Sequence, residues 1–343
     1  MKKVQKIAVW RIALVVTLGA AAVSLHSCMG VIGKANAQST PKGVDFDIAI
    51  IPDPQYYVAE THGGKPEMLY AQFSWIKQHH IDSNIVFVAG MGDNVDNTKN
   101  GVSIDQQWSN VKDNGGYYSL ETPAPGIPYG LAVGNHDEAD TVYHVGDAKF
   151  HGVSGIDPVR NTTWRFNKYF GVDHFKNKPW YGGHPDILGK NNNDCHYDKF
   201  TVAGQACLMV FLPYDNENYE DKDGLMLKWA LGIVRANPKA KAIIISHGIL
   251  KGALLPNGQN EMQLQGQRIY DAFKAEPNVS IFLCGHVNQG YHEETYNGHK
   301  IRIFMSDYQG QANGGNGMMR TMKLNTANDE VSFHTFSPYL EKQ

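Results

Sequence analysis

Residues 84–97 constrain the fold of this chain more than any other stretch. The apolar run at residues 85–89 is rich in β-branched and aromatic side chains, which is typical of a buried strand, and Gly90 ends it. Two carboxylates, Asp93 and Asp96, follow the strand three residues apart. The rim of a sheet gains nothing from such carboxylates, whereas a metal site does, because rigid strand ends hold ligands in place. This stretch therefore predicts a ligand site at the end of a buried strand.

Strands and helices alternate along the first third of the chain. Apolar runs at residues 45–51, 84–90 and 129–133 predict strands. Pro66 opens a predicted helix between the first two strands, and Ser103 begins another as the N-cap of a capping box. This alternation is typical of a layered α/β fold.

The second half of the chain predicts further strands and helices of the same kind. A hairpin occupies residues 195–212, with its turn at Ala203-Gly204. Helices are expected near residues 224–236 and 262–274, and strands at residues 242–246, 280–284, 300–305, 318–324 and 331–336. One domain over residues 45–343 is the simplest interpretation.

Residues 138–194 interrupt this pattern with a polar, glycine-rich segment. We expect an insertion that lies over the site at the strand ends. Its aromatic residues have two interpretations: they line a substrate cleft, or they attach a long loop to the body of the protein. These aromatic residues are Trp164, Phe170, Trp180 and Tyr181.

The composition excludes some partners. The chain has 343 residues, of which 42% are hydrophobic, so it can bury a large core. The formal net charge is −3, which gives no electrostatic reason to expect a nucleic-acid polymer as partner. This charge is compatible with a small-molecule partner, and the oligomeric state is not indicated.

The first 37 residues predict a signal peptide. Basic residues precede an apolar stretch at residues 12–25, which is shorter than the roughly 20 residues of a membrane-spanning helix. Two processing sites compete: an A-x-A site at residues 35–37, and a lipobox-like stretch at residues 25–28 that would place a lipid anchor on Cys28. Either one predicts an exported protein, whether periplasmic, an outer-membrane lipoprotein or secreted, with residues 38–44 as a linker.

The other three cysteines predict no disulfide framework. Cys195 and Cys207 flank the hairpin turn but are not opposite one another in its simplest register. We expect them, with Cys284, to be small buried apolar residues.

Five predicted strands end in residues that bind metals or transfer protons. Each group alone has an ordinary structural explanation. Five such endings together favour a ligand site, because open α/β sheets bind ligands at the carboxyl ends of their strands. The groups are Asp53 with Gln55, Asp93 with Asp96, Asn135 with His136, His247 alone, and His286 with Asn288.

In this order the five groups resemble the motifs of the calcineurin-like metallophosphoesterase family. The family's blocks are D-x-H, G-D-x-x-D, G-N-H-[DE], a lone histidine after an apolar strand, and G-H-x-H. The resemblance spans about residues 45–310, and Asp307-Tyr308-Gln309 is similar to a secreted bacterial branch. It implies a four-layer α/β sandwich: two mixed β-sheets flanked by helices.

The resemblance also implies a centre of two divalent metal ions bridged by Asp93. A hydroxide between the ions would attack phosphorus in line. His136 would protonate the leaving oxygen or hold the phosphoryl group, and Asp96 would orient His136. One metal would be bound by Asp53, Gln55 and Asp93, and the other by Asp93, Asn135, His247 and His286.

Two residues depart from the family's pattern. Gln55 and Asn288 stand where the family has histidines, so the first site would be all-oxygen if Asn288 binds at all. Oxygen ligands suit Mg²⁺, Mn²⁺ or Ca²⁺, whereas the imidazole site would hold Mn²⁺ or iron more tightly; zinc also stays open. His292 is an alternative source of the missing imidazole.

The chain is therefore expected to be an exported metal-dependent hydrolase of phosphate esters, with phosphomonoesters favoured. One alternative is a phosphodiesterase acting on nucleotides or lipid headgroups. The other is a non-catalytic metal-binding surface protein. Asn94 and Tyr56 are candidates for contact with the substrate, and Asp307 for a supporting role near the site.

Overall fold

The computed structural model describes residues 43–98, 100–113, 115–138, 163–215, 221, 224–328 and 330–342. The predicted signal peptide, most of the predicted linker, and residues 139–162 of the predicted insertion lie outside the described residues. No described helix combines the length and the apolar character that a membrane span requires.

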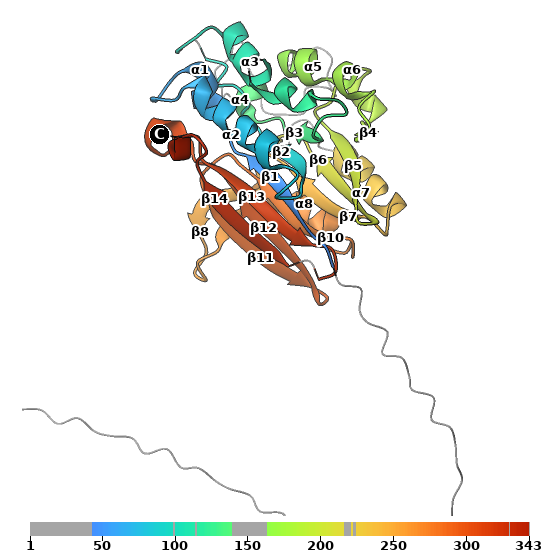
Figure 1. Ribbon diagram of the computed structural model, residues 1–343. Coiled ribbons are helices and arrows are strands. Elements are labelled where there is room, and N and C mark those ends of the chain that lie inside the picture. The colour runs from blue at the N-terminus through green and yellow to red at the C-terminus, as the bar shows by residue number, and fades with distance from the viewer. Residues whose placement is uncertain are drawn as a thin grey trace, which may run out of the picture. The chain divides into compact units, whose positions relative to one another are not determined.

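Five strands form the first sheet, in the order β14-β13-β1-β2-β3 (Figure 1). The strands β1, β2 and β3 run parallel, and β13 and β14 extend the sheet in antiparallel fashion. Strand β13, from the last part of the chain, thus lies beside β1, the first strand of the fold. The strands are β1 (Asp45–Ile51), β2 (Ile85–Gly90), β3 (Tyr129–Leu131), β13 (Met319–Asn325) and β14 (Val331–Phe336).

Seven strands form the second sheet, in the order β11-β12-β10-β7-β6-β5-β4. Its central strands pair in parallel, and the strands at its two edges pair antiparallel. The strands are β4 (Tyr181–Gly183), β5 (His196–Val202), β6 (Gln205–Phe211), β7 (Lys241–Ile245), β10 (Val279–Cys284), β11 (Gly290–Tyr296) and β12 (His299–Met305).

The two sheets pack face to face through aromatic side chains. Phe87 of β2 stacks on Phe200 of β5, with ring centroids 5.5 Å apart. Strand β6 is apolar on both faces, which explains its unbroken apolar sequence: Met209 joins the core between the sheets, whereas Leu208 and Val210 face helices.

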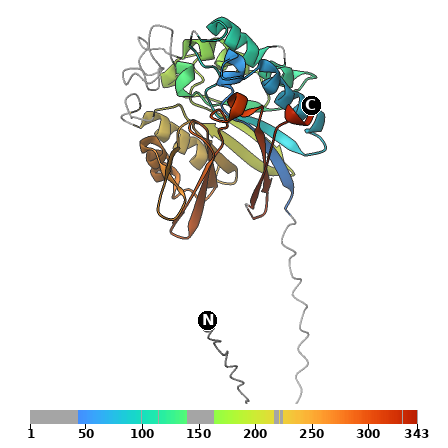
Figure 2. The same ribbon diagram turned by 90° about the vertical axis from the view of Figure 1, so that its left-hand side faces the viewer.

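Helices cover the outer face of each sheet. Trp75 of α2 (Pro66–His79) packs on Phe336 of β14, with centroids 4.6 Å apart. The helices α7 (Leu225–Ala236) and α8 (Leu264–Phe273) share an apolar cluster with the second sheet. Figure 2 shows the gold and orange helices of this cluster on one side of the sheets and the blue helices on the other. The predicted four-layer arrangement of two mixed sheets flanked by helices is confirmed.

The helix α3 (Ile104–Lys112) begins where the sequence predicts. The Ser103 hydroxyl accepts a hydrogen bond from the Gln106 backbone N–H at 3.2 Å, which satisfies one of the free donors of the first turn. The reciprocal half of the capping box is not formed, because the Gln106 side chain donates to Asn110.

The described part of the predicted insertion is attached to the body by its aromatic residues. It forms α5 (Trp164–Phe170), α6 (Val172–Phe175) and β4. Phe170 and Trp180 are buried, and the Trp180 indole N–H donates to the Tyr129 carbonyl at 2.9 Å. Tyr181 donates to Asn193, and Trp164 is exposed beside Arg165. Attachment is thus the interpretation that holds for Phe170 and Trp180.

The three cysteines of the described chain form no disulfide and are buried, as the sequence predicts. Cys207 pairs with Phe200 across the hairpin rather than with Cys195.

Candidate metal centre

The carboxyl ends of strands from both sheets meet at the candidate site. Asp53 follows β1 and Asp93 follows β2 in the first sheet, whereas His247 follows β7 and His286 follows β10 in the second. The His286 backbone N–H donates to Asp53 Oδ2 at 2.7 Å, and His247 Nε2 lies 3.2 Å from Asp93 Oδ1. The site therefore lies where the two sheets converge.

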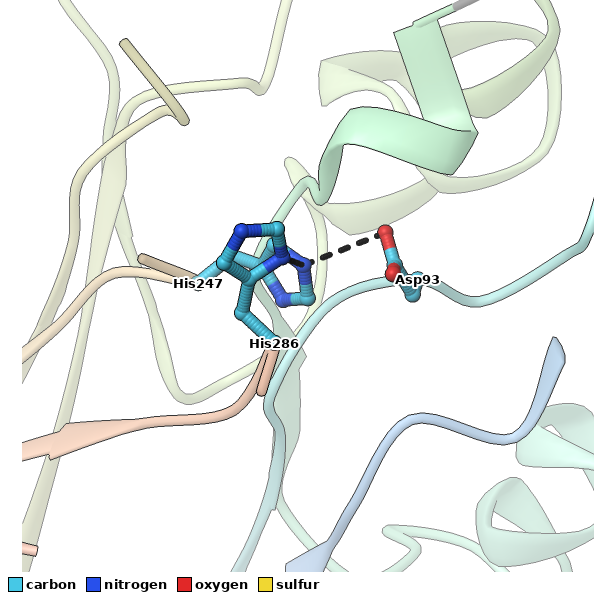
Figure 3. A group of neighbouring side chains, drawn as sticks. All are labelled: Asp93, His247 and His286. Carbon is cyan, nitrogen blue, oxygen red and sulfur yellow. Dashed lines mark hydrogen bonds and ion pairs between the residues drawn. The ribbon is translucent and has the colours of Figure 1, made fainter. Parts of the chain in front are cut away.

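One carboxylate and two imidazoles form a compact group. The ligand atoms of Asp93, His247 and His286 all lie within 4.8 Å of one another (Figure 3). His247 Nε2 is 3.1 Å from His286 Nδ1. His247 Nδ1 lies 2.8 Å from the Met91 carbonyl, which only an N–H can contact favourably, so this bond directs the Nε2 lone pair toward the group.

Asn135 completes the group from the helix α4 (Asn135–Glu138). Its Oδ1 lies 3.2 Å from His247 Nε2. Two glycines of the sequence motifs permit this close packing. A Cβ on Gly134 would lie 2.2 Å from Asp93 Oδ1, and a Cβ on Gly92 would lie 2.6 Å from His247 Nδ1.

The backbone is strained at two of the candidate ligands. Asp93 has φ of 47° and His286 has φ of 84°, both in the left-handed region that favours glycine. Strain of this kind costs about 1–3 kcal/mol per residue and concentrates at functional sites.

Asp53 and Gln55 border Asp93 on its other side. Gln55 begins the helix α1 (Gln55–Ala59), and its Nε2 donates to Asp93 Oδ2 at 3.1 Å. Asp53 Oδ1 and Gln55 Oε1 are buried, and neither has a hydrogen-bond partner within the described residues. Buried oxygens without partners are costly, and a bound cation would satisfy both. The donor atoms therefore fit a divalent ion on this side as well.

Buried charges shift the pKa values in the group. Burial lowers the pKa of His247, but the carboxylates of Asp93 and Asp53 outweigh it and raise that pKa to about 10. Burial raises the pKa of Asp93, but His247 and His136 bring it well below its usual range. The group thus attracts positive charge, which protons or metal ions can supply.

His136 and Asp96 form a pair beside this group. His136 Nδ1 lies 3.3 Å from Asp96 Oδ1 and 3.0 Å from the Asp96 carbonyl, while Nε2 faces Asp93 Oδ2 at 4.0 Å. Burial lowers the pKa of His136, but Asp93 and Asp96 raise it to about 9. Asp96 thus holds the ring with one nitrogen toward the candidate ligands.

Within the described residues, Asn288 makes no hydrogen bond to the other candidate ligands. Asn288 lies on the exposed turn after β10. Its amide nitrogen lies 3.5 Å from the position of a Cβ on Gly252, in the strand β8 (Leu250–Leu254). His292 does not replace it, because its ring nitrogens lie 2.7 Å from the Asn260 carbonyl and 3.3 Å from Glu294 Oε1.

Asn94 makes hydrogen bonds that support the loops of the site, and its expected contact with the substrate stays a prediction. It is fully buried, and its amide donates to the Ala132 carbonyl at 3.0 Å and to Asp137 Oδ2 at 2.9 Å. Tyr56 is half-buried and packs against His62, with the rings tilted and their centroids 4.1 Å apart. Burial and the carboxylates of Asp96 and Asp93 raise the pKa of Tyr56, and its contact with the substrate stays a prediction.

Sequence reasoning assigned no role to Asp137, although it belongs to the quoted G-N-H-D motif. Its carboxylate accepts from the backbone N–H groups of Gly134 and Asn94, both at 2.9 Å. Burial and the charge of Asp93 raise its pKa to about 7, although these hydrogen bonds act to lower it. Asp137 therefore joins the loops that carry Asp93 and His136.

Tyr214 is a further contact that the sequence did not reveal. Its ring lies 5.6 Å from His247 and 5.4 Å from His286, measured between centroids. It follows β6 in a loop without any motif, so only the sheet order brings it to the site.

Comparison with known proteins gives one family. The model of the calcineurin-like phosphoesterase family matches residues 46–290. The uncharacterized protein YvnB of Bacillus subtilis (strain 168) is 30% identical over 299 residues, which cover 84% of this chain and 20% of YvnB. The chain thus spans about a fifth of the length of that relative.

Two solved structures are similar at low sequence identity. GAP50, the anchor in the inner membrane complex of Plasmodium, is 15% identical, with a TM-score of 0.48 over 86% of this chain and 85% of its own. A dimetal phosphatase from Danio rerio is 11% identical, with a TM-score of 0.46 over 85% of this chain and 98% of its own. Both TM-scores are below 0.5, so no structural or functional inference rests on either.

Proposed function

This chain belongs to the calcineurin-like phosphoesterase family, and from that premise we propose that it is an exported enzyme that hydrolyses small phosphomonoesters. The family makes the chain a metal-dependent phosphoester hydrolase. The observation that carries the proposal is the position of Asp93, which contacts His247 on one side and Gln55 on the other. One carboxylate between two sets of donors suits a bridging ligand.

The donor atoms on the two sides of Asp93 support two divalent ions of different character. When bound, such ions would acidify an attacking water and neutralise the phosphoryl oxygens. The oxygen side suits Mg²⁺, Mn²⁺ or Ca²⁺, and the imidazole side suits manganese, iron or zinc. The oxygen side comprises Asp53, Gln55 and Asp93, and the imidazole side comprises Asp93, Asn135, His247 and His286.

His136 would transfer the proton that the leaving oxygen needs. Its Nε2 faces Asp93 at 4.0 Å and the ring keeps some exposure, so a substrate bound at the metals would be within its reach. Asp96 would position the ring through its carboxylate and its carbonyl, both of which lie near Nδ1.

This pair also separates an enzyme from a non-catalytic metal-binding protein that keeps the fold. A purely structural metal site needs neither a partly exposed imidazole beside its ligands nor a carboxylate that orients it. The positions of His136 and Asp96 support the enzyme.

The test is hydrolysis of p-nitrophenyl phosphate and bis-p-nitrophenyl phosphate by the metal-stripped protein. Mn²⁺, Mg²⁺, Zn²⁺ or Ca²⁺ is added back singly and in pairs. We expect turnover only with added metal, and faster turnover of the monoester. Faster turnover of the diester would overturn the proposed preference for monoesters. The proposal of an enzyme would be overturned by an intact protein that binds metal but hydrolyses neither ester nor a panel of natural phosphoesters.

Export has its own test. Cell fractionation should place the protein outside the cytoplasm, and intact-mass measurement should show either a lipidated Cys28 or a new N-terminus after residue 37. The variant Cys28→Ser would shift a lipidated protein from the membrane fraction to the soluble fraction. Recovery of the uncleaved chain in the cytoplasm would contradict export.

A further inference from the structure

A sixth strand of the fold ends in a carboxylate at the same site. Strand β12 lies parallel to β10, with Met305 opposite Cys284. Two residues further along, β12 leads to Asp307 and β10 leads to His286. The Ser306 backbone N–H donates to the Cys284 carbonyl at 2.8 Å, so the two strands stay paired up to the point where these side chains begin.

Asp307 is buried and only partly satisfied. Its exposed fraction is 2%, and its Oδ1 accepts from the Gln309 backbone N–H at 2.7 Å. Its Oδ2 is buried and has no hydrogen-bond partner within the described residues. Asp307 lies close enough to Asp53 for its charge to raise the pKa of the Asp53 carboxyl, in addition to the effect of burial.

Three buried oxygens of the segments that follow β1 and β12 are thus without hydrogen-bond partners within the described residues. They are Asp53 Oδ1, Gln55 Oε1 and Asp307 Oδ2. Across the described chain, the ion-pair partners of Asp93 are His247 and His136, and neither Asp53 nor Asp307 pairs with a lysine or arginine. Burying carboxylates without a cation is costly, and a divalent ion would remove that cost.

We propose that Asp307 binds the metal ion on the oxygen side, in the position that the family's motif assigns to the imidazole at Asn288. This inference rests on the two-metal centre of the proposed function. The register of β10 and β12 places Asp307 beside His286, whereas Asn288 lies on an exposed turn against β8.

The loop that carries Asp307 is held rigidly, as a ligand loop must be. The Gln309 side chain donates to the His286 carbonyl at 3.3 Å. Arg320 donates to the Ser306 hydroxyl at 3.1 Å and lies over the ring of Tyr308 at 6.0 Å. These contacts join the loop to both sheets.

A carboxylate in place of an imidazole changes which ions this site prefers. The donors on this side would then be three carboxylates and one amide, all through oxygen. Such a set favours hard ions, Mn²⁺, Mg²⁺ or Ca²⁺, over Zn²⁺. The inference therefore gives the oxygen side a complete ligand set without an imidazole.

The test is Mn²⁺ binding by the purified, metal-stripped protein, measured by calorimetry and by electron paramagnetic resonance. Asp307→Asn keeps the size of the side chain and an oxygen that accepts from Gln309, and Asn288→Ala is the matched control. We expect two ions and a spin-coupled spectrum for the wild type and for Asn288→Ala. For Asp307→Asn we expect the ion on the oxygen side to bind at least tenfold more weakly than it does in the wild type, and an uncoupled spectrum at a metal concentration that fills both wild-type sites.

Melting curves of the metal-free proteins exclude a folding defect, because Asp307→Asn removes a buried charge and should melt no lower than the wild type. An Asp307→Asn variant that binds both ions as tightly as the wild type does would overturn the role of Asp307 while leaving the proposed function intact. Fewer than two ions in the wild type would overturn the two-metal centre and this inference together.

Discussion

The backbone N–H of His286 donates to Oδ2 of Asp53 at 2.7 Å, and this bond joins the end of β10 in one sheet to the end of β1 in the other. The residues are 233 positions apart in the chain. The bond connects the two sides of the candidate metal centre directly. The other oxygen of this carboxylate, Asp53 Oδ1, is buried and has no hydrogen-bond partner among the described residues.

Asp53→Asn is expected to separate the structural and metal-binding roles of this carboxylate. The amide oxygen still accepts from His286, while the buried charge is removed, so the metal-free protein should melt at the same or a higher temperature. The rise in melting temperature on adding Mn²⁺ should be smaller than for the wild type. A metal-free variant that melts well below the wild type would show that the charge itself stabilises the fold.

His136→Ala is expected to lose on the order of a hundredfold or more in kcat, because the proton donor is removed. Both metals should stay bound, since the ring lies beside the candidate ligands and is not one of them. Steady-state kinetics with p-nitrophenyl phosphate and metal analysis of the same sample make the measurement. The control is His80→Ala, at the far end of α2, which should keep wild-type kcat. Loss of metal in His136→Ala would assign the ring to the ligands instead.

Gly134→Ala is expected to destabilise the protein by about 1–3 kcal/mol and to weaken metal binding. The new Cβ would lie 2.2 Å from Asp93 Oδ1 and 2.3 Å from the Asp93 backbone nitrogen. Gly232→Ala in α7 is the matched control, because a Cβ there meets no atom within 4 Å and the helix should gain about 0.5–1 kcal/mol. Urea unfolding of the wild type and both variants measures the change in the free energy of unfolding. Equal stabilities would contradict the predicted crowding at Asp93.

Removing metal should reveal two sites of unequal affinity. The imidazole side offers two ring nitrogens 3.1 Å apart. The oxygen side offers only oxygen donors, which release a transition-metal ion more easily. Dialysis against dilute chelator should leave about one ion per chain, and metal analysis of the dialysed protein measures it. Two ions retained equally would contradict this expectation.

Stability should fall in acid through Glu121, far from the metal ligands. Burial raises the pKa of Glu121, but hydrogen bonds from His174, Lys178 and Tyr129 outweigh it and bring that pKa to about 2, below its ordinary value of 4.5. A depressed carboxyl pKa contributes stability that is fully present above pH 4.5 and is lost as the pH falls toward 2. The wild type should therefore exceed Glu121→Gln in free energy of unfolding at pH 7.

The measurement is urea unfolding of both proteins at several pH values between 7 and 2.5. The difference between them should shrink steadily below pH 4.5. A difference that does not change with pH would show that the cluster around Glu121 acts through packing rather than charge.

Local sequence was enough to predict most of the fold. The strands β1 and β14 have the predicted bounds, and the N-cap of α3 is Ser103 as predicted. Apolar runs, capping residues and turn glycines act over a few residues, so they can be recognised without knowing what packs against them. The hairpin of β8 with β9 (Asn260–Met262) was missed, because its short exposed strands carry no apolar pattern.

The candidate site was predicted as a set of strand endings, and the structure brings most of that set together. Asp53, Gln55, Asp93, Asn135, His136, His247 and His286 meet in one group, with Asp96 holding His136. Their assignment as metal ligands and proton donor remains a prediction. Asn288 and Asn94 were chosen from motif spacing alone, and spacing does not reveal in which direction a side chain points.

By itself, the sequence determined most of the strands and the polar residues that follow them, since both depend on neighbours along the chain. Only the tertiary structure decided which of those residues face one another. Asp307 lies beside His286 because β12 pairs with β10 in a defined register. Asn288, two residues from His286, turns outward to β8. That choice depends on contacts between segments far apart in sequence, which no local pattern encodes.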